Sequence, residues 1–196
     1  MDRAAEVLGQ GGVLAYPTET LYGLGVDPFR TEALEGLYRL KDRPASRAVS
    51  VLVQEMEMLE EVAREIPRWA CRILETFLPG PLTAVLPARP HLPGLLTGGT
   101  EKIGVRISSH PLMPHLFARF PHPVTTTSAN RSGMPPAAAA EEIRAAFPQG
   151  IDCILDAGPA PGGTGSTVVD LTGREPVILR EGAVTREQIL GCLKDA

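Results

Sequence analysis

Three cationic residues lie within one seven-residue segment, at Lys41, Arg43 and Arg47, with Pro44 between them. Lys41 falls at the predicted end of a helix, where its charge would complement the helix dipole without any ligand. Pro44 cannot continue that helix, so the chain turns and both arginines can converge with Lys41. Converging cations suit a polyphosphate, because each charge-assisted hydrogen bond is worth about 1.5–3 kcal/mol. The segment therefore predicts a phosphate site, and dipole complementation by Lys41 is the simpler alternative.

Small polar residues and glycines follow two predicted strands. The stretch 17–25 reads PTETLYGLG, and its hydroxyls and glycine amides can face a ligand at the carboxyl edge of a sheet. The stretch 125–130 reads TTTSAN, and its Ser and Asn donors suit phosphate oxygens or an adenine edge. Both stretches are equally compatible with polar turns. Neither identifies a ligand by itself.

Two arginines stand inside apolar strand sequences, Arg106 in GVRI and Arg180 in ILREG. A guanidinium on a buried strand needs an anion, which is either a ligand or an internal carboxylate. Glu19 and Asp170 are the candidate internal partners. Strand alternation should place Arg106 on the face opposite to its isoleucine and valine neighbours.

Common signatures of enzymes and nucleotide sites are incomplete in this sequence. The glycine-rich stretch 158–166 lacks the Gly-Lys-Ser/Thr ending of a phosphate loop, and 23–28 has two of the three glycines of a dinucleotide fingerprint. No serine stands in a G-x-S-x-G motif, and the histidines and cysteines lack the spacing of a zinc site. A Rossmann protein, a serine hydrolase and a zinc enzyme are therefore disfavoured.

The composition is that of a globular protein. The chain has 196 residues, of which 43% are hydrophobic and 21% charged, with a formal net charge of -4. No apolar run approaches the roughly 20 residues that cross a bilayer, and no signal segment stands at the N-terminus. We therefore expect one domain over residues 1–196, located in the cytoplasm and without contact to a membrane. The negative charge disfavours a protein that only clamps nucleic acid.

Apolar periodicity predicts alternating helices and strands. Helices are predicted over residues 2–8, 31–41 with Thr31 as N-cap, 55–64, 67–77, 111–119, 139–146, and from Thr185, whose partner Gln188 completes a capping box. Strands are predicted over residues 12–16, 48–53, 82–87, 102–107, 123–127, 151–155, 167–171 and 176–180. Some connections are too short for a helical crossover, so the pattern predicts an α/β fold with a mixed sheet.

Taken in order, four motifs resemble those of the YrdC family of threonylcarbamoyl-AMP synthases. They are PTETLYGLG, K-x-R-P, TSAN-x-SG, and STVVD followed by LREG, and they run from about Gly12 to Gly182. The chain resembles the short, single-domain bacterial form. This resemblance implies a twisted, mostly parallel α/β sheet with a concave ligand-binding face. It also implies that L-threonine, bicarbonate and ATP are combined, with release of pyrophosphate, into the intermediate for threonylcarbamoyladenosine in tRNA.

The resemblance also assigns residues by motif. It implies that ATP is bound by Lys41, Arg43, Arg47, Ser128, Asn130, Ser166 and Arg180. It implies that L-threonine is bound by Thr20, Arg106 and Thr126. No side chain stands out as a nucleophile or a metal ligand, so magnesium is expected to come with the phosphates of ATP. The implied downstream partner is the transferase complex that passes the threonylcarbamoyl group to tRNA.

The chain departs from the family pattern in three places. Leu52 stands where some longer relatives have a histidine near threonine, and Lys102 replaces a small hydroxyl residue. Arg47-Ala48-Val49 replaces a common Lys-Pro-Leu, so this loop is expected to be more mobile. Two other functions stay open: an RNA-binding module that uses the same concave basic face, and a carbamoyl-AMP-forming domain like that of larger hydrogenase-maturation enzymes.

Overall fold

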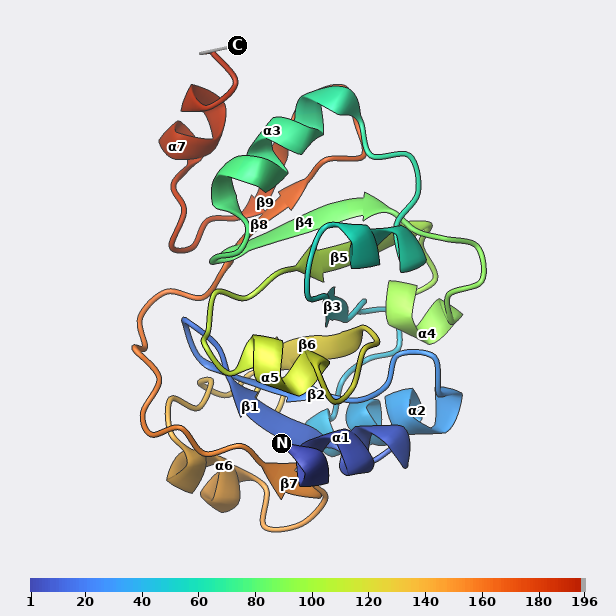
Figure 1. Ribbon diagram of the computed structural model, residues 1–196, viewed down its shortest axis with the longest axis vertical. Helices are drawn as coiled ribbons and strands as arrows, with labels where there is room; N and C mark the ends of the chain where they lie inside the picture. Colours follow the sequence, from blue (N-terminus) through green and yellow to red (C-terminus); the bar gives the residue numbers. More distant parts are fainter. Residues whose placement is uncertain (195–196) are drawn as a thin grey trace.

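Residues 1–194 are described by the structure, which is a computed structural model. Within them, nine strands form one sheet in the order β7-β1-β2-β6-β3-β5-β4-β8-β9 (Figure 1). The strands are β1 (Leu14–Pro17), β2 (Tyr22–Gly25), β3 (Ser50–Leu52), β4 (Leu82–Pro87), β5 (Lys102–Arg106), β6 (Val124–Ser128), β7 (Cys153–Ile154), β8 (Thr167–Asp170) and β9 (Val177–Arg180). The single domain over residues 1–196 stays a prediction, and its last two residues lie outside the described part.

The mixed α/β sheet is confirmed, but the expectation of a mostly parallel sheet is wrong. The pairs β1–β7, β3–β5 and β4–β8 are parallel, and the other five pairs are antiparallel. The physical reason is visible at β1 and β2, where the short link between Pro17 and Tyr22 permits only a hairpin. Strand β2 is not among the predicted strands, and its two glycines are atypical of strands.

The helices follow the predicted pattern with two corrections and one addition, α4 (Gly94–Thr97), which was not predicted. They are α1 (Asp2–Gly9), α2 (Thr31–Lys41), the 3-10 helix η1 (Glu57–Glu61), α3 (Arg68–Phe77), α4 (Gly94–Thr97), α5 (Met113–Phe117), α6 (Ala140–Ala146) and α7 (Arg186–Gly191). The stretch predicted as a helix over 55–64 is a short 3-10 turn, and Arg30 rather than Thr31 is the N-cap of α2. The capping box of Thr185 and Gln188 is confirmed. None of these helices has the length and apolar character that crossing a bilayer requires.

Strand β6 joins the two halves of the sheet. Its end, Thr127 and Ser128, pairs with β2, whereas Val124–Thr126 pairs with β3 on the other side. Figure 1 shows β6 between the β7–β1–β2 part of the molecule and the part that contains β5, β4 and β8. The TTTSAN segment therefore lies at the middle of the sheet.

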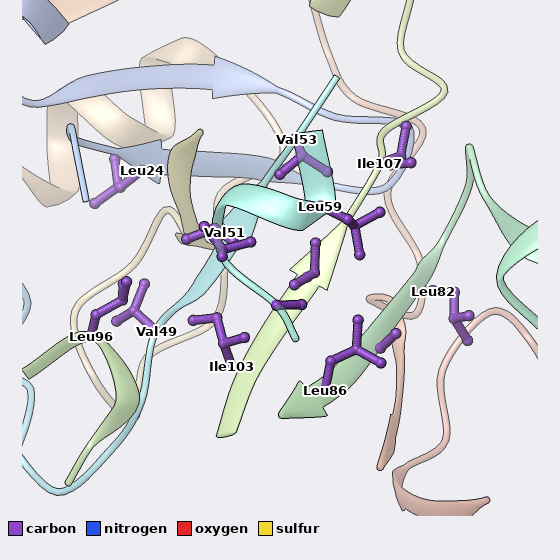
Figure 2. Packing of buried hydrophobic residues seen from close by; sticks show 14 of the residues in the cluster. Leu24, Val49, Val51, Val53, Leu59, Leu82, Leu86, Leu96, Ile103 and Ile107 are labelled. Atoms are coloured by element: carbon purple, nitrogen blue, oxygen red, sulfur yellow. The ribbon is translucent and has the colours of Figure 1, made fainter. Parts of the chain in front are cut away.

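One face of the sheet carries the main hydrophobic core. Leu24, Val51, Ile103 and Leu86 pack there, under Leu59 of η1 and alongside Leu96 of α4 (Figure 2). The helices α2 and α3 add Leu34, Leu37, Ile73 and Leu74 to the same cluster. This burial explains why the apolar periodicity of these elements could be detected in the sequence.

The opposite face is only partly covered. A second cluster joins Leu14, Tyr16, Leu52 and Val124 of the strands to residues of α1 and α5, among them Leu8 and Leu116. Beyond this cluster, the same face carries small and polar residues. The cavity described next lies on that part of the sheet.

Candidate active site

A cavity of about 290 Å³ lies over the middle strands, and its wall consists mostly of hydroxyl-bearing, small and arginine side chains. It contains seven of the residues assigned to the ligands by motif: Thr20, Arg43, Arg106, Thr126, Ser128, Ser166 and Arg180. It also contains Ser50 and Thr83, which the sequence analysis missed because they belong to no recognisable motif. Of the described residues on this wall, none is acidic. The site is therefore suited to an anionic ligand.

The register of the strands brings these polar residues together. Ser50 of β3 pairs with Thr126 of β6, and the next residues, Val51 and Val105, pair β3 with β5. Gly104 is thereby set beside Ser50, and a Cβ at Gly104 would lie only 2.4 Å from the Ser50 Oγ atom. A glycine in GVR therefore leaves room for the serine hydroxyl on the floor of the cavity.

Arg106 meets the cavity from β5 and is almost wholly buried. Its Nη2 atom donates to Glu19 Oε1 at 2.6 Å and to Thr20 Oγ1 at 3.2 Å. Its Nε atom is buried and has no hydrogen-bond partner among the described residues. The prediction that Glu19 is its internal partner is confirmed.

The alternative partner, Asp170, is wrong for Arg106. Asp170 instead accepts from Lys102 Nζ at 2.7 Å, because β5 and β8 flank β4 and both residues lie at the same end of the sheet. Burial opposes ionisation of Asp170, but hydrogen bonds from Lys102 and Thr172 lower its pKa below the usual value. Lys102 is thus engaged in an ion pair at the sheet edge.

Thr20 is held with a defined hydroxyl orientation. The Thr18 hydroxyl donates to the Leu21 carbonyl at 2.7 Å, so the 3.0 Å contact between Thr18 and Thr20 is donated by Thr20. Thr20 Oγ1 in turn accepts from Arg106. This chain of hydrogen bonds fixes the PTET loop against β5.

Arg43 reaches the cavity from the turn after α2. Its Nε atom donates to the Arg47 carbonyl at 3.1 Å and its Nη2 atom to the Ala48 carbonyl at 2.6 Å. Its guanidinium also lies 6.0 Å from the centre of the Tyr38 ring. The side chain of Arg47 is exposed and does not line the cavity, so the structure brings only one of the two arginines to the wall. The greater mobility of this loop stays a prediction.

Lys41 lies behind the wall rather than on it. Its side chain is 1% exposed, and Nζ donates to the carbonyls of Ser128 and Asn130 at 2.5 and 2.6 Å and to Asn130 Oδ1 at 3.3 Å. Three acceptors use all three donors of an ammonium group. Burial, and secondly the charge of Arg43, lowers the pKa of Lys41 to about 7. The expected convergence with Arg43 on one phosphate is therefore not present in this geometry.

Asn130 also turns away from the cavity. Its Oδ1 atom accepts from Ser128 Oγ at 2.6 Å, and its Nδ2 atom donates to the Met134 carbonyl. Lys41 and Asn130 together fix the end of β6, from which Ser128 reaches the cavity wall. The sequence motifs brought Lys41, Ser128 and Asn130 together correctly. They could not show that Ser128 lines the cavity, whereas Lys41 and Asn130 lie behind its wall.

The far side of the cavity is built by β8 and β9. Arg180 Nη2 donates to the Ser166 carbonyl at 2.7 Å, and Ser166 Oγ lies 2.9 Å from Thr83 Oγ1. A Cβ at Gly182 would lie 2.1 Å from the Gly165 carbonyl oxygen, which explains the glycine of LREG. Leu52 is fully buried in the second hydrophobic cluster and does not line the cavity.

No group of three or more His, Cys, Asp or Glu residues that could hold a metal ion occurs in residues 1–194. We therefore assign no metal site to the described residues.

Known proteins resemble this chain over nearly its whole length. A family model for Sua5, YciO and YrdC, described as telomere recombination, matches residues 6–182. The threonylcarbamoyl-AMP synthase of Pyrococcus abyssi is 38% identical over 95% of this chain and 55% of that protein. That of Nitrosococcus oceani is 38% identical over 83% of this chain and 85% of that protein. The chain thus spans about half the length of the Pyrococcus abyssi relative and a larger share of the other.

Solved structures agree with the fold. The structure of Pyrococcus abyssi Sua5 complexed with L-threonine superposes with a TM-score of 0.93 at 37% identity, over 97% of this chain and 56% of that one. Escherichia coli YciO superposes with a TM-score of 0.86 at 27% identity, over 96% and 91% of the two chains. With the family model covering residues 6–182 and relatives of this similarity, the chain belongs to the Sua5/YciO/YrdC family.

Proposed function

We propose that this chain makes threonylcarbamoyl-AMP from L-threonine, bicarbonate and ATP and releases pyrophosphate. The observation that carries the proposal is the buried Arg106, whose Nε atom lacks a partner in the described chain, on a wall that also holds Arg43 and Arg180. The same cavity therefore offers Arg106 to a carboxylate and two further cations, Arg43 and Arg180, to a polyphosphate. Relatives named threonylcarbamoyl-AMP synthase and a Sua5 structure with L-threonine support this assignment.

In this proposal the threonine carboxylate meets Arg106. The Nη2 atom of Arg106 is already held by Glu19 and Thr20, so its remaining N–H donors would meet the carboxylate. Thr20 Oγ1 offers an acceptor, and Thr126 offers a hydroxyl from the neighbouring strand. The ammonium group of threonine would then be directed toward the open part of the cavity.

The nucleotide would use the cationic and hydroxyl residues of the wall. Arg43 and Arg180 neutralise phosphate charge, and Ser166 donates a hydrogen bond. The Ser128 hydroxyl donates to Asn130, so it offers its oxygen as an acceptor to the nucleotide. Lys41 and Asn130 act from behind by fixing Ser128. Magnesium belongs to the substrate as MgATP, because no acidic residue among the described wall residues could replace the phosphates as its ligand.

The chemistry needs little acid or base from the protein. The threonine amine, once deprotonated, forms a C–N bond with the bicarbonate carbon, and water leaves to give the carbamate. A carbamate oxygen then attacks the α-phosphorus, and pyrophosphate carries away the electron pair of the broken P–O bond. Positioning of the two substrates and neutralisation of phosphate charge therefore supply most of the rate enhancement. The product is an activated mixed anhydride, which a threonylcarbamoyl transferase acting on tRNA would consume.

The test is pyrophosphate release from ATP by the purified chain, with threonine and bicarbonate added separately and together. We expect release only when both are present. Arg43→Ala should reduce the rate strongly, whereas Arg131→Ala, a matched surface change in an ion pair with Asp42, should not. Release that needs carbamoyl phosphate instead would favour the carbamoyl-AMP alternative. Salt-dependent RNA binding without any turnover would favour the RNA-binding module.

A further inference from the structure

Glu19 is a partly buried carboxylate next to the cavity, and the proposed reaction does not use it. Its side chain is 16% exposed, and it is absent from the wall itself. Oε1 accepts from Arg106 Nη2 at 2.6 Å, and Oε2 accepts from the Ser108 hydroxyl. Ser108 Oγ also accepts from the His110 backbone amide at 3.2 Å. Each carboxylate oxygen of Glu19 is therefore bound to a different donor.

These contacts fix the plane of the Arg106 guanidinium. Two consecutive residues, Glu19 and Thr20, both accept from the same Nη2 atom, so rotation of the guanidinium would break two hydrogen bonds at once. Ser108 holds the other oxygen of Glu19, which prevents the carboxylate from following such a rotation. The buried Nε atom is left without a partner in residues 1–194.

We propose that Glu19 and Ser108 are positioning residues that orient Arg106 toward the carboxylate of the amino-acid substrate; this rests on the proposed function. Glu19 touches neither substrate. It acts through the hydrogen bond to Nη2, and Ser108 acts through Glu19. The same pair keeps the buried guanidinium paired when the cavity is empty.

Two roles of Glu19 predict different results. If Glu19 only balances a buried charge, Glu19→Gln and Glu19→Ala both leave Arg106 uncompensated and both destabilise the chain without a specific effect on threonine. In a positioning role, the amide oxygen of Gln still accepts from Nη2, so Glu19→Gln retains threonine binding and Glu19→Ala loses it. The conservative variant thus separates geometry from charge.

The experiment measures the dissociation constant of L-threonine by calorimetry, together with KM for threonine and for ATP. We expect Glu19→Ala to raise the threonine dissociation constant and KM at least tenfold, with KM for ATP changed less than twofold and Glu19→Gln within about threefold of the wild type. Ser108→Ala should raise the dissociation constant and KM for threonine about threefold. Ser108→Thr, which keeps a hydroxyl group, should leave both at the wild-type values. The control is Ser109→Ala, which changes an exposed serine of the same turn.

Ser108→Ala keeps the proposal testable if Glu19→Ala does not fold, since it leaves the Arg106–Glu19 pair intact. A double variant, Glu19→Gln with Ser108→Ala, should show non-additive effects on threonine binding, because the two side chains share one hydrogen bond. Threonine constants that stay at the wild-type values in Ser108→Ala and the double variant overturn the positioning role alone. A wild-type chain that binds no threonine overturns the proposed function and the inference together.

Discussion

Arg106 stands in a strand whose neighbouring side chains, Ile103 and Val105, are buried in the main core on the opposite face. Strand alternation predicted this separation, and the structure confirms it. The sequence also indicated that the guanidinium needs an anion and named Glu19 as one candidate. It could not show that Glu19 and Thr20 share a single nitrogen of Arg106, because that depends on how the PTET loop lies against β5.

We predict that Arg106→Lys keeps the fold and ATP binding but weakens the use of threonine about tenfold or more. A lysine carries the charge but cannot form a planar, two-point contact with a carboxylate, and a tenfold loss corresponds to about 1.4 kcal/mol. The measurement is threonine-dependent pyrophosphate release together with the melting temperature. A lowered melting temperature with unchanged threonine dependence would show that Arg106 serves the fold only.

For Lys41, the sequence motif predicted the position in the fold but not the direction of the side chain. The sequence predicts it at the end of α2, which is confirmed, and the break at Pro44 predicts that Arg43 and Arg47 converge with it on a phosphate. The structure buries its ammonium group against the carbonyls of Ser128 and Asn130. Those acceptors come from residues almost ninety positions away, so local sequence could not reveal them.

Lys41 gives a pH dependence of stability with a definite sign. Its pKa falls from 10.5 to about 7 in the folded chain, chiefly through burial. Between these values the unfolded state binds more protons, so this residue makes the free energy of unfolding rise with pH above about 7. We expect the difference in unfolding free energy between the wild type and Lys41→Met to grow from pH 7 to pH 9 in urea titrations. Lys194→Met, at an exposed lysine, is the control, and a difference independent of pH would contradict the prediction.

The element that sequence patterns missed is β2. Its sequence YGLG has glycines at alternate positions, which lowers strand propensity, and yet both glycines face the ring of Tyr16 on β1. The glycines of β2 thus leave room for the large buried side chain of Tyr16 on β1. Helix α4 was also missed, because its four residues are too few to show periodicity.

The two glycines of β2 should differ in tolerance to alanine. At Gly25, a Cβ would lie 2.5 Å from Val124 Cγ1 and 2.8 Å from the Thr125 carbonyl oxygen. At Gly23, the nearest atom would be Tyr16 Cζ at 3.4 Å. We therefore expect Gly25→Ala to lower the free energy of unfolding by about 1–3 kcal/mol or more, and Gly23→Ala by less than about 1 kcal/mol. Chemical denaturation of both variants is the measurement, and equal losses would contradict the packing shown here.

At the scale of the molecule, the sequence predicted the class of fold and most of its elements but not the order of the strands. Strand order depends on pairings between distant segments, such as Leu14 with Cys153 and Leu82 with Thr167. Apolar periodicity indicates which face of a strand is buried, but it does not indicate which other strand pairs with that strand. The family resemblance supplied the overall architecture, although the share of parallel pairs was wrong.

The cavity wall draws on both parts of the sheet, with Thr20 and Ser128 on one side and Thr83, Ser166 and Arg180 on the other. A ligand bound there should stabilise the whole chain rather than one segment. We predict that threonine and ATP each raise the melting temperature, and that threonine at a hundred times its dissociation constant adds about 2.7 kcal/mol to the free energy of unfolding. Differential scanning fluorimetry over a range of ligand concentrations checks this. No shift at millimolar concentrations of either ligand would contradict it.

The long-range pairing of the sheet also sets the order in which the site can be assembled during synthesis. The chain crosses from β7, at one edge, toward the other side of the sheet, where Ser166 directly precedes β8 and Arg180 ends β9 (Figure 1). Strand β1 can pair with β2 as soon as both are made, but its outer partner β7 is made only after β2 to β6. A nascent chain therefore displays β1 with one unpaired edge, and an unfinished cavity until Ser166 and Arg180 have left the ribosome, so ligands can protect the chain only after that point.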